Sequence, residues 1–412
     1  DGNKLWATIS TVDGLGNRLT THESSFHVTA QQINAIVSRV DTIDGTISRA
    51  GWITSADGNR LWASKSLENG GTIVSFINQS AEDVAINAEH IRLEGLVTAN
   101  EYFKVLEDGS IEGYSVEELN IDNVNAGKTL FELYDLTGKE KYRKAIDLVY
   151  SQIKKMPRTK EGNFWHKNIY PNQVWLDGLY MCQPFYMEYE TRFNDKKNYD
   201  DIFSQFFNVA EHMRDPKTGL YYHAYDSSRE MFWCDKVTGL SQNFWLRALG
   251  WYSMALLDTL DKADASVGEP YEKMKQIFVD LMDSMLKYQD ESGMWYQVVN
   301  FGGMDKNYLE TSGSSIMAYS LLKGVRLGYL PESYREYAEK AIDGICAKYL
   351  KTDEGKMSLG GICLVAGFGG KNNRSGTYDY YMSEPIVEDD AKGVGPFLLA
   401  YTEMLTYKKN NK

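Results

Sequence analysis

Cysteine is scarce in this chain of 412 residues, and its four copies, Cys182, Cys234, Cys346 and Cys363, stand far apart. They form no CxxC pair and no cluster with histidine, which argues against a thiolate metal site and against a disulfide framework. Histidine is also scarce. Its six copies are scattered and form no HExxH pair. We therefore expect neither a protein-bound metal nor a cofactor.

Long apolar runs and a positive charge balance are also absent. No apolar run approaches the ~20 residues that cross a bilayer, and the formal net charge is −13. These properties exclude a membrane span and argue against nucleic acid as a partner. They leave room for a small anionic substrate, since a few local cations can bind one. The chain begins at Asp1 without an initiator methionine or a signal peptide. This predicts a soluble fragment or processed form, either cytoplasmic or periplasmic.

The first 114 residues hold little tyrosine or phenylalanine and much serine, threonine, asparagine, glycine, isoleucine and valine. The phrase DGNKLWA at 1–7 returns as DGNRLWA at 57–63, which indicates an internal duplication. Asp-Gly turns between short alternating runs predict β-hairpins, so we expect a β-rich module over 1–114. Residues 28–40 are the exception, because their apolar positions fit a helical or coiled-coil face.

Two phrases of this half, SSFHVTAQQINAIVSRV and INQSAEDVAINAEHIRLEGLVTANEYFKVLEDGSI, resemble tail-fibre or minor tail proteins of phages and prophages. Those proteins carry such modules as elongated, usually trimeric connectors. The resemblance implies that this module allows self-association.

From residue 114 onwards the sequence becomes rich in aromatic residues at helical spacing. It predicts helices over 122–136, 140–155, 173–192, 199–213, 243–260, 270–288, 312–326, 332–349 and 391–407. A turn followed by aromatic residues returns between them, as GNFWH at 162–166, GLYYH at 219–223 and GMWYQ at 293–297. The spacing suits two helices per repeat, which predicts a closed ring of helical hairpins. We expect the three aromatic loops to line a cleft at its mouth.

The stretch 162–185 carries the strongest sign of chemistry. Its carboxylate, Asp177, stands between Trp175 and Tyr180 at the start of a predicted helix. Desolvation by such neighbours would raise the pKa of Asp177, as a general acid at neutral pH requires. The alternative is that Asp177 only stabilises the helix N-terminus through the helix dipole.

A second informative stretch, 215–251, contains the best candidates for binding an anion. Arg247 lies in one predicted helix with Trp245 and Trp251, and its guanidinium can grip a carboxylate with two donors. His223 could donate to the same anion. The alternatives are a structural ion pair for Arg247 and a satisfied core position for His223. Asp226 is either a third acid or part of a plain turn.

Residues 117–410 resemble the unsaturated rhamnogalacturonyl hydrolases of glycoside hydrolase family 105. The resemblance rests on long, ordered phrases, among them YPNQVWLDGLYM, TGLYYHAYD, FWLRALGWYSMALLD and LETSGSSIMAY. It implies an all-α (α/α)6 barrel over 115–412. In the family a leading stretch with the first helices of the barrel precedes the position of Asp122, and here the β-rich module stands in its place. We therefore expect a barrel that lacks its first helices.

The resemblance also implies a function and a set of site residues. Family members remove a terminal Δ4,5-unsaturated galacturonic acid from pectin-derived oligosaccharides, so the expected ligand is an anionic unsaturated oligosaccharide. The two family carboxylates match Asp177, in the WLDG phrase, and Asp122, in NIDNVNAGKTLFELY. The residues implied to line the sugar subsites are His166, Trp175, His223, Trp245, Arg247 and Trp251.

The implied reaction is the hydration of a vinyl ether. Protonation of C4 creates an oxocarbenium-like centre at C5, water adds there, and the hemiketal opens and expels the neighbouring sugar. Asp177 would give the proton and then take one from water, while Asp122 positions water or holds up the pKa of Asp177. Two other classes stay open, namely a virion-associated carbohydrate-binding protein without turnover and another (α/α)6 sugar enzyme.

Overall fold

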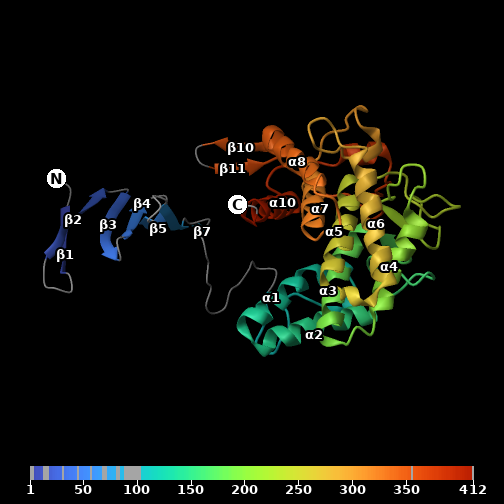
Figure 1. The fold of residues 1–412 in the computed structure, drawn as a ribbon, viewed down its shortest axis with the longest axis horizontal. Coiled ribbons are helices and arrows are strands. Elements are labelled where there is room, and N and C mark those ends of the chain that lie inside the picture. The colour runs from blue at the N-terminus through green and yellow to red at the C-terminus, as the bar shows by residue number, and fades with distance from the viewer. Residues whose placement is uncertain are drawn as a thin grey trace. The chain divides into compact units, whose positions relative to one another are not determined.

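The structure is a computed structural model that describes residues 104–353 and 356–410, and before them the backbone of seven strands between residues 4 and 87 (Figure 1). The chain divides into two compact units, Asp1–Val97 and Thr98–Lys412. Val105 and Ile111 belong to the hydrophobic core of the second unit. The boundary expected near residue 114 therefore falls inside this second unit.

The first unit is one antiparallel sheet whose strands pair in chain order from β1 to β7. The strands are β1 (Lys4–Val12), β2 (Arg18–Thr29), β3 (Gln32–Ile43), β4 (Thr46–Ser55), β5 (Gly58–Ser66), β6 (Thr72–Gln79) and β7 (Val84–Asn87). The β-rich prediction is thus confirmed, but the helix expected over 28–40 is wrong. Val28 pairs with Ile33 across the β2–β3 hairpin. The β-branched residues of this segment favour extended backbone, and that preference outweighs their helical spacing.

The second unit is mainly helical, and all nine helices predicted from the spacing of apolar residues are confirmed. They are η2 (Ile121–Gly127) continued by α1 (Lys128–Thr137), α2 (Glu140–Lys155), α3 (Leu176–Phe193), α4 (Tyr199–Met213), α5 (Leu246–Lys262), α6 (Glu269–Leu286), α7 (Thr311–Arg326), α8 (Tyr334–Tyr349) and α10 (Ala391–Asn410). Shorter elements lie in the connections, including β8 (Gln173–Trp175), β9 (Ala224–Asp226) and α9 (Tyr378–Ser383). Of the helices described, none combines the length and the apolar character of a membrane span.

These helices form two layers. The inner helices α3, α5, α7 and α10 pack against one another in turn, and η2 packs against α3. Small residues make the contact close, since a Cβ at Gly313 of α7 would lie 2.3 Å from Cγ of Leu246 in α5. The outer helices, such as α2, bury their apolar face and expose the opposite, polar face. Within the described residues the ring has nine helical segments, whereas six complete hairpins would have twelve.

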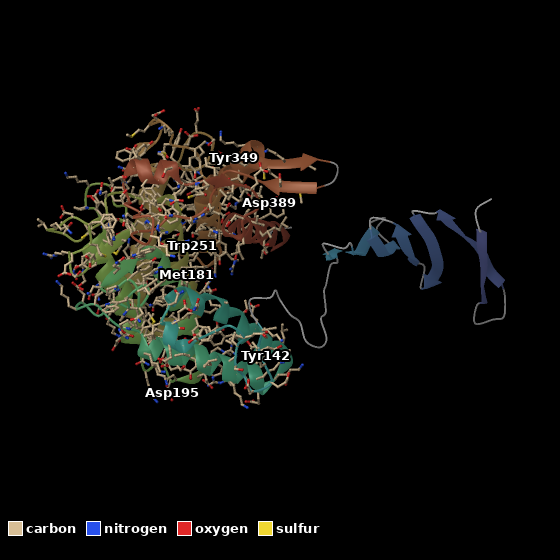
Figure 2. The ribbon with its side chains drawn as sticks, turned by 180° about the vertical axis from the view of Figure 1, so that it is seen from behind. Tyr142, Met181, Asp195, Trp251, Tyr349 and Asp389 are labelled. Atoms are coloured by element: carbon tan, nitrogen blue, oxygen red, sulfur yellow. The ribbon has the colours of Figure 1, made fainter. Side chains whose placement is uncertain are left out.

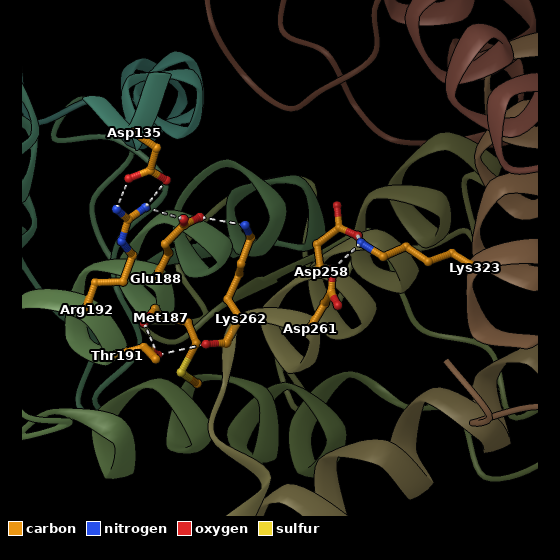
Figure 3. A network of polar contacts seen from close by, with 9 residues as sticks. All are labelled: Asp135, Met187, Glu188, Thr191, Arg192, Asp258, Asp261, Lys262 and Lys323. Carbon is orange, nitrogen blue, oxygen red and sulfur yellow. Dashed lines mark hydrogen bonds and ion pairs between the residues drawn. The ribbon is translucent and has the colours of Figure 1, made fainter. Parts of the chain in front are cut away.

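Ion pairs join neighbouring inner helices, and those from α1 to α7 lie near the C-terminal turns (Figure 3). They link α1 to α3 (Asp135–Arg192), α3 to α5 (Glu188–Lys262, 2.9 Å), α5 to α7 (Asp258–Lys323, 2.9 Å, and Asp261–Lys323, 2.8 Å) and α7 to α10 (Glu403–Arg326, 2.7 Å). Lys323 is buried, and its removal would leave Asp258 and Asp261 without their cationic partner. Because an outer helix separates consecutive inner helices, the inner helices run parallel. Their N-terminal ends therefore gather at the opposite end of the ring.

Candidate functional site

A cavity of about 460 Å³ opens at the N-terminal ends of η2, α3, α5 and α10. Met181 and Trp251, which both line it, lie near the middle of the helical unit in Figure 2. Seven of the eight predicted site residues line this cavity, namely Asp122, His166, Trp175, Asp177, Trp245, Arg247 and Trp251. Residues more than a hundred positions apart in the chain are thus brought to one place.

Asp177 is the second residue of α3, and its side chain is 15% exposed. Its Oδ2 lies 3.1 Å from Nε2 of His223. Burial raises the pKa of the Asp177 carboxyl. The electrostatic interaction and the hydrogen bond with His223, together with the electrostatic interaction with His166, outweigh burial and hold this pKa below its usual value. The raised pKa expected from the sequence is therefore wrong for the unliganded protein, because the buried histidine beside the carboxylate was not foreseen.

His223 is fully buried behind Asp177 instead of facing the cavity. Its Nε2 contacts Asp177, and its Nδ1 lies 2.8 Å from the hydroxyl of Tyr381. The rings of Trp245 and Phe368 pack on it, each with its centroid 4.7 Å away. Both ring nitrogens are occupied, which favours the alternative of a satisfied core position over a contact of His223 with the substrate carboxylate. Its partners are groups of the protein.

The second carboxylate, Asp122, lines the same cavity from η2. Its Oδ2 lies 2.7 Å from Nζ of Lys167, and its Oδ1 lies 3.6 Å from Nε2 of His166. His166 is buried and stacks on Trp175, with ring centroids 4.4 Å apart. Burial lowers the pKa of His166 although the charges of Asp122 and Asp177 both oppose that change. His166 therefore lies within electrostatic reach of both carboxylates.

An aromatic pair stands beside another wall of the cavity. Trp251 lines the cavity and stacks on Tyr180, with ring centroids 5.0 Å apart. Nζ of Lys128 lies 3.5 Å from the centroid of the Tyr180 ring. This Nζ is buried and has no hydrogen-bond partner within the described part of the chain. Burial lowers the pKa of Lys128 to about 7. Sequence reasoning missed this amine, because its place in the apolar stripe of a helix gives no sign of it.

We expect Lys128→Met to stabilise the protein by about 1–3 kcal/mol at pH 7 and below. Burial of the unpartnered ammonium costs free energy, and its contact with the Tyr180 ring offsets only part of that cost. Above pH 7 the folded protein holds the amine neutral while the unfolded chain still binds the proton. The gain should therefore shrink as the pH rises from about 7 and vanish above 10.5, the ordinary pKa of the amine. Urea unfolding across this pH range measures the gain in stability. A variant that is less stable than the wild type at pH 7 would contradict the claim that burial of the Lys128 ammonium costs free energy.

Two guanidinium groups line the cavity without a carboxylate at ion-pair distance among the described residues. Arg247 is only 1% exposed, and it donates to Oγ of Ser312 at 3.1 Å and to the backbone carbonyls of Cys363 and Leu364. Arg247 thus anchors the loop that follows Cys363. This geometry makes it a weaker candidate for gripping a ligand than the sequence suggested.

Arg374 is the better placed cation, and sequence reasoning missed it. Its closest hydrogen bonds are long, 3.4 Å to Oη of Tyr170 and 3.4 Å to the carbonyl of Gly369. It lies beside Trp175 because Gly367 has no side chain. A Cβ at Gly367 would be 2.9 Å from Nη1 of Arg374 and 3.0 Å from Trp175. No periodicity or motif marks this loop, so no local pattern pointed to Arg374.

Two other expectations concern the recurring aromatic loops and Asp226. Of the three recurring loops, the first reaches the cavity through His166, whereas the phenylalanine, tryptophan and tyrosine residues of all three loops do not line it. Phe164, Tyr221 and Trp295 are at most 3% exposed and pack in the core, because large rings stabilise more when they are buried. Asp226 belongs to a turn, as its buried carboxylate accepts hydrogen bonds from the backbone N–H groups of residues 228, 230 and 231. In the described ranges no group of three or more metal-binding side chains is arranged to hold an ion.

Known proteins share this fold and much of this sequence. Residues 94–408 match Glycosyl Hydrolase Family 88. Unsaturated rhamnogalacturonyl hydrolase YesR from Bacillus subtilis is 26% identical over 310 residues, which cover 74% of this chain and 80% of that protein. The 24.9 kDa protein in picA locus from Rhizobium radiobacter is 38% identical over 234 residues, 55% of this chain and 98% of that protein.

A solved structure extends the likeness to three dimensions. A glycoside hydrolase from family 105 of C. acetobutylicum has a TM-score of 0.71 and 50% sequence identity. The match covers 74% of this chain and 84% of that chain. Together with the two helical layers, these matches confirm the predicted (α/α)6 fold of the second unit.

Proposed function

The chain belongs to Glycosyl Hydrolase Family 88 and is a glycoside hydrolase of the unsaturated uronyl hydrolase type, and we propose that it removes terminal Δ4,5-unsaturated galacturonic acid from rhamnogalacturonan-derived oligosaccharides. The observation that carries this proposal is one cavity lined by Asp177, Asp122 and two guanidinium groups without a carboxylate partner among the described residues. An anionic sugar would supply the missing carboxylate. The name of the relative YesR supports the rhamnogalacturonyl class.

The chemistry that we propose adds water across the C4=C5 bond. A proton from Asp177 adds to C4, and the ring oxygen stabilises the positive charge at C5. Water then attacks C5 and returns a proton to Asp177, and the resulting hemiketal opens and releases the neighbouring sugar. Direct displacement at the glycosidic carbon by two carboxylates is not needed.

Asp177 must gain a proton before it can act as the acid. Its pKa lies below the usual value in the unliganded protein, so it is ionised at neutral pH. The carboxylate of the bound sugar is a like charge, and the sugar also displaces water from the cavity. Both effects raise the pKa of Asp177. Substrate binding and proton uptake are therefore coupled in this proposal.

The other cavity residues fit supporting roles. Asp122, held by Lys167, is placed to orient the attacking water or a sugar hydroxyl. Trp251 offers a partly exposed aromatic face on which a flat unsaturated ring can stack. Arg374 is placed to hold the sugar carboxylate.

Arg374→Met should raise KM by about tenfold to a hundredfold and change kcat much less. The reason is that a charge-assisted hydrogen bond to the carboxylate, worth about 1.5–3 kcal/mol, is made in both ground state and transition state. Steady-state kinetics on the unsaturated disaccharide measures both constants. Lys371→Met is the matched control, since Lys371 is an exposed cation of the same loop that does not line the cavity. An unchanged KM in Arg374→Met would remove Arg374 from the site.

The substrate class is tested with lyase-generated disaccharides whose double bond absorbs in the ultraviolet. We expect the protein to consume unsaturated galacturonyl-rhamnose with a higher kcat/KM than an unsaturated glucuronyl disaccharide from a glycosaminoglycan. The reverse preference would overturn the rhamnogalacturonyl assignment. Binding of both without loss of absorbance would favour the alternative of a carbohydrate-binding protein without turnover.

For the first unit we propose a phage-tail-like connector that associates with further copies of itself. This is supported by the internal repeat and by a sheet in which, among the described strands, β1 and β7 each have one neighbour. Strand edges of this kind can pair with another chain. Light scattering on the full chain tests the idea, and a monomer at every concentration would contradict it.

A further inference from the structure

Nδ1 of His223, the ring nitrogen that does not contact Asp177, contacts Tyr381, a residue that the proposed reaction does not use. We propose that Tyr381 is a positioning residue of the site, whose hydroxyl donates to Nδ1 of His223 and keeps the imidazole neutral with its proton on Nε2. This inference rests on the proposed function of Asp177 as the acid. It adds a third member to the pair of His223 and Asp177.

The geometry sets the direction of both hydrogen bonds. Tyr381 lies in α9 and, like His223, has no exposed surface. Oη of Tyr381 lies 2.8 Å from Nδ1, and Nε2 lies 3.1 Å from Oδ2 of Asp177. A carboxylate oxygen only accepts, so the imidazole proton belongs on Nε2. Among the described groups, Nδ1 is the only hydrogen-bond partner recorded for the Tyr381 hydroxyl. The hydroxyl therefore donates to Nδ1.

This arrangement decides where an additional proton resides. If Nδ1 were free, it could bind a proton, and the resulting imidazolium would hold Asp177 as a carboxylate. Protonation of Nδ1 would break the hydrogen bond from Tyr381 and leave this buried O–H without an acceptor among the described groups, so an additional proton is favoured on Asp177, whose side chain reaches the cavity. Burial raises the pKa of Tyr381 well above its ordinary value, so Tyr381 keeps its own proton. It directs the proton without supplying it.

Other charged and titratable groups face this chain of three from the surrounding elements. His166 faces Asp177, and Asp122 and Lys167 face His166. The groups that face Tyr381 are Tyr380, Cys363 and Glu384. A substitution that removes only the Tyr381 hydroxyl leaves all of these groups in place. A change in pH dependence can then be assigned to the lost hydrogen bond.

The first test is the pH dependence of Tyr381→Phe. We expect kcat to fall about tenfold at neutral pH, with little change in KM, and the alkaline limb of the kcat profile to move down by about one pH unit. Tyr380→Phe is the matched control. It removes a hydroxyl from the same short helix, and that hydroxyl accepts from the backbone N–H of Gly367 at 3.0 Å. Its alkaline limb should not move. A lower kcat in Tyr381→Phe with an unmoved limb would show a packing role only and overturn the proposal.

The second test does not depend on catalysis. Nitrogen NMR of the imidazole ring reports which nitrogen of His223 is protonated, with the signal assigned by comparison with His223→Gln. The wild-type protein should show protonated Nε2 and bare Nδ1 at neutral pH, and Tyr381→Phe should show a larger imidazolium fraction. A proton on Nδ1 of the wild type would overturn the inference even in an active enzyme. The expected tautomer in a protein that consumes no unsaturated sugar would instead overturn the proposed function.

Discussion

Asp177→Asn is expected to lose roughly two to four decades or more in kcat while the protein still binds the sugar. Asparagine keeps the size of the side chain and an oxygen that can accept from Nε2 of His223, so the surroundings of the site should persist. It cannot deliver a proton to C4 or take one from water. The loss should therefore appear in kcat. Turnover is followed by the disappearance of the double-bond absorbance, and binding by calorimetry.

A matched control separates this effect from a general one. Asp195 is an exposed carboxylate just after the C-terminal end of α3, apart from Trp251 in Figure 2. Its positive φ of 51° is tolerated by asparagine. Asp195→Asn makes the same chemical change and should leave kcat unchanged. If Asp177→Asn kept more than about a tenth of the wild-type kcat, Asp177 would not be the proton donor.

Asp122→Asn is expected to lower kcat by about a hundredfold with a smaller effect on KM. The carboxylate lines the cavity with Asp177, and its charge orients a water or a sugar hydroxyl in the transition state. Asparagine retains an oxygen that can accept from Lys167, which lies 2.7 Å from the carboxylate. The local fold should thus survive, and stopped-flow single turnovers would measure the chemical step.

Lys167→Met tests whether Asp122 acts by its own charge or only through its ion pair. This variant removes the cation and leaves the carboxylate, so we expect a loss of less than about tenfold. Equal losses in the two variants would mean that the ion pair acts as a unit. If Asp122→Asn kept the wild-type kcat, Asp122 would have no part in the chemistry.

The helices could be predicted because their signal is local. Apolar residues at three- and four-residue steps mark each helix from α2 to α8, and burial of those faces drives the packing that is observed. The segment 28–40 shows the limit of this reasoning. Its apolar residues satisfy a helical pattern, but its β-branched side chains and the neighbouring strand favour β3.

The site could be predicted in its parts and only incompletely in its arrangement. The resemblance placed Asp177, Asp122 and the tryptophans, and all of these line the cavity. The state of Asp177 depends on His223, which is 46 residues away, so the nearest neighbours in sequence suggested the wrong direction of its pKa shift. Tyr381 contacts His223 across 158 residues and Arg374 contacts Tyr170 across 204. No local pattern encodes such contacts.

The central claim, hydration of an unsaturated uronide, is tested most directly by giving the wild-type protein a matched pair of disaccharides. One is unsaturated galacturonyl-rhamnose, and the other is its saturated counterpart with the same linkage. The measurement is the rate at which rhamnose is released from each. We predict release from the unsaturated compound only, because the saturated ring has no vinyl ether for Asp177 to protonate. Release from the saturated compound at a comparable rate would contradict the account and assign the site to ordinary glycoside cleavage by two carboxylates.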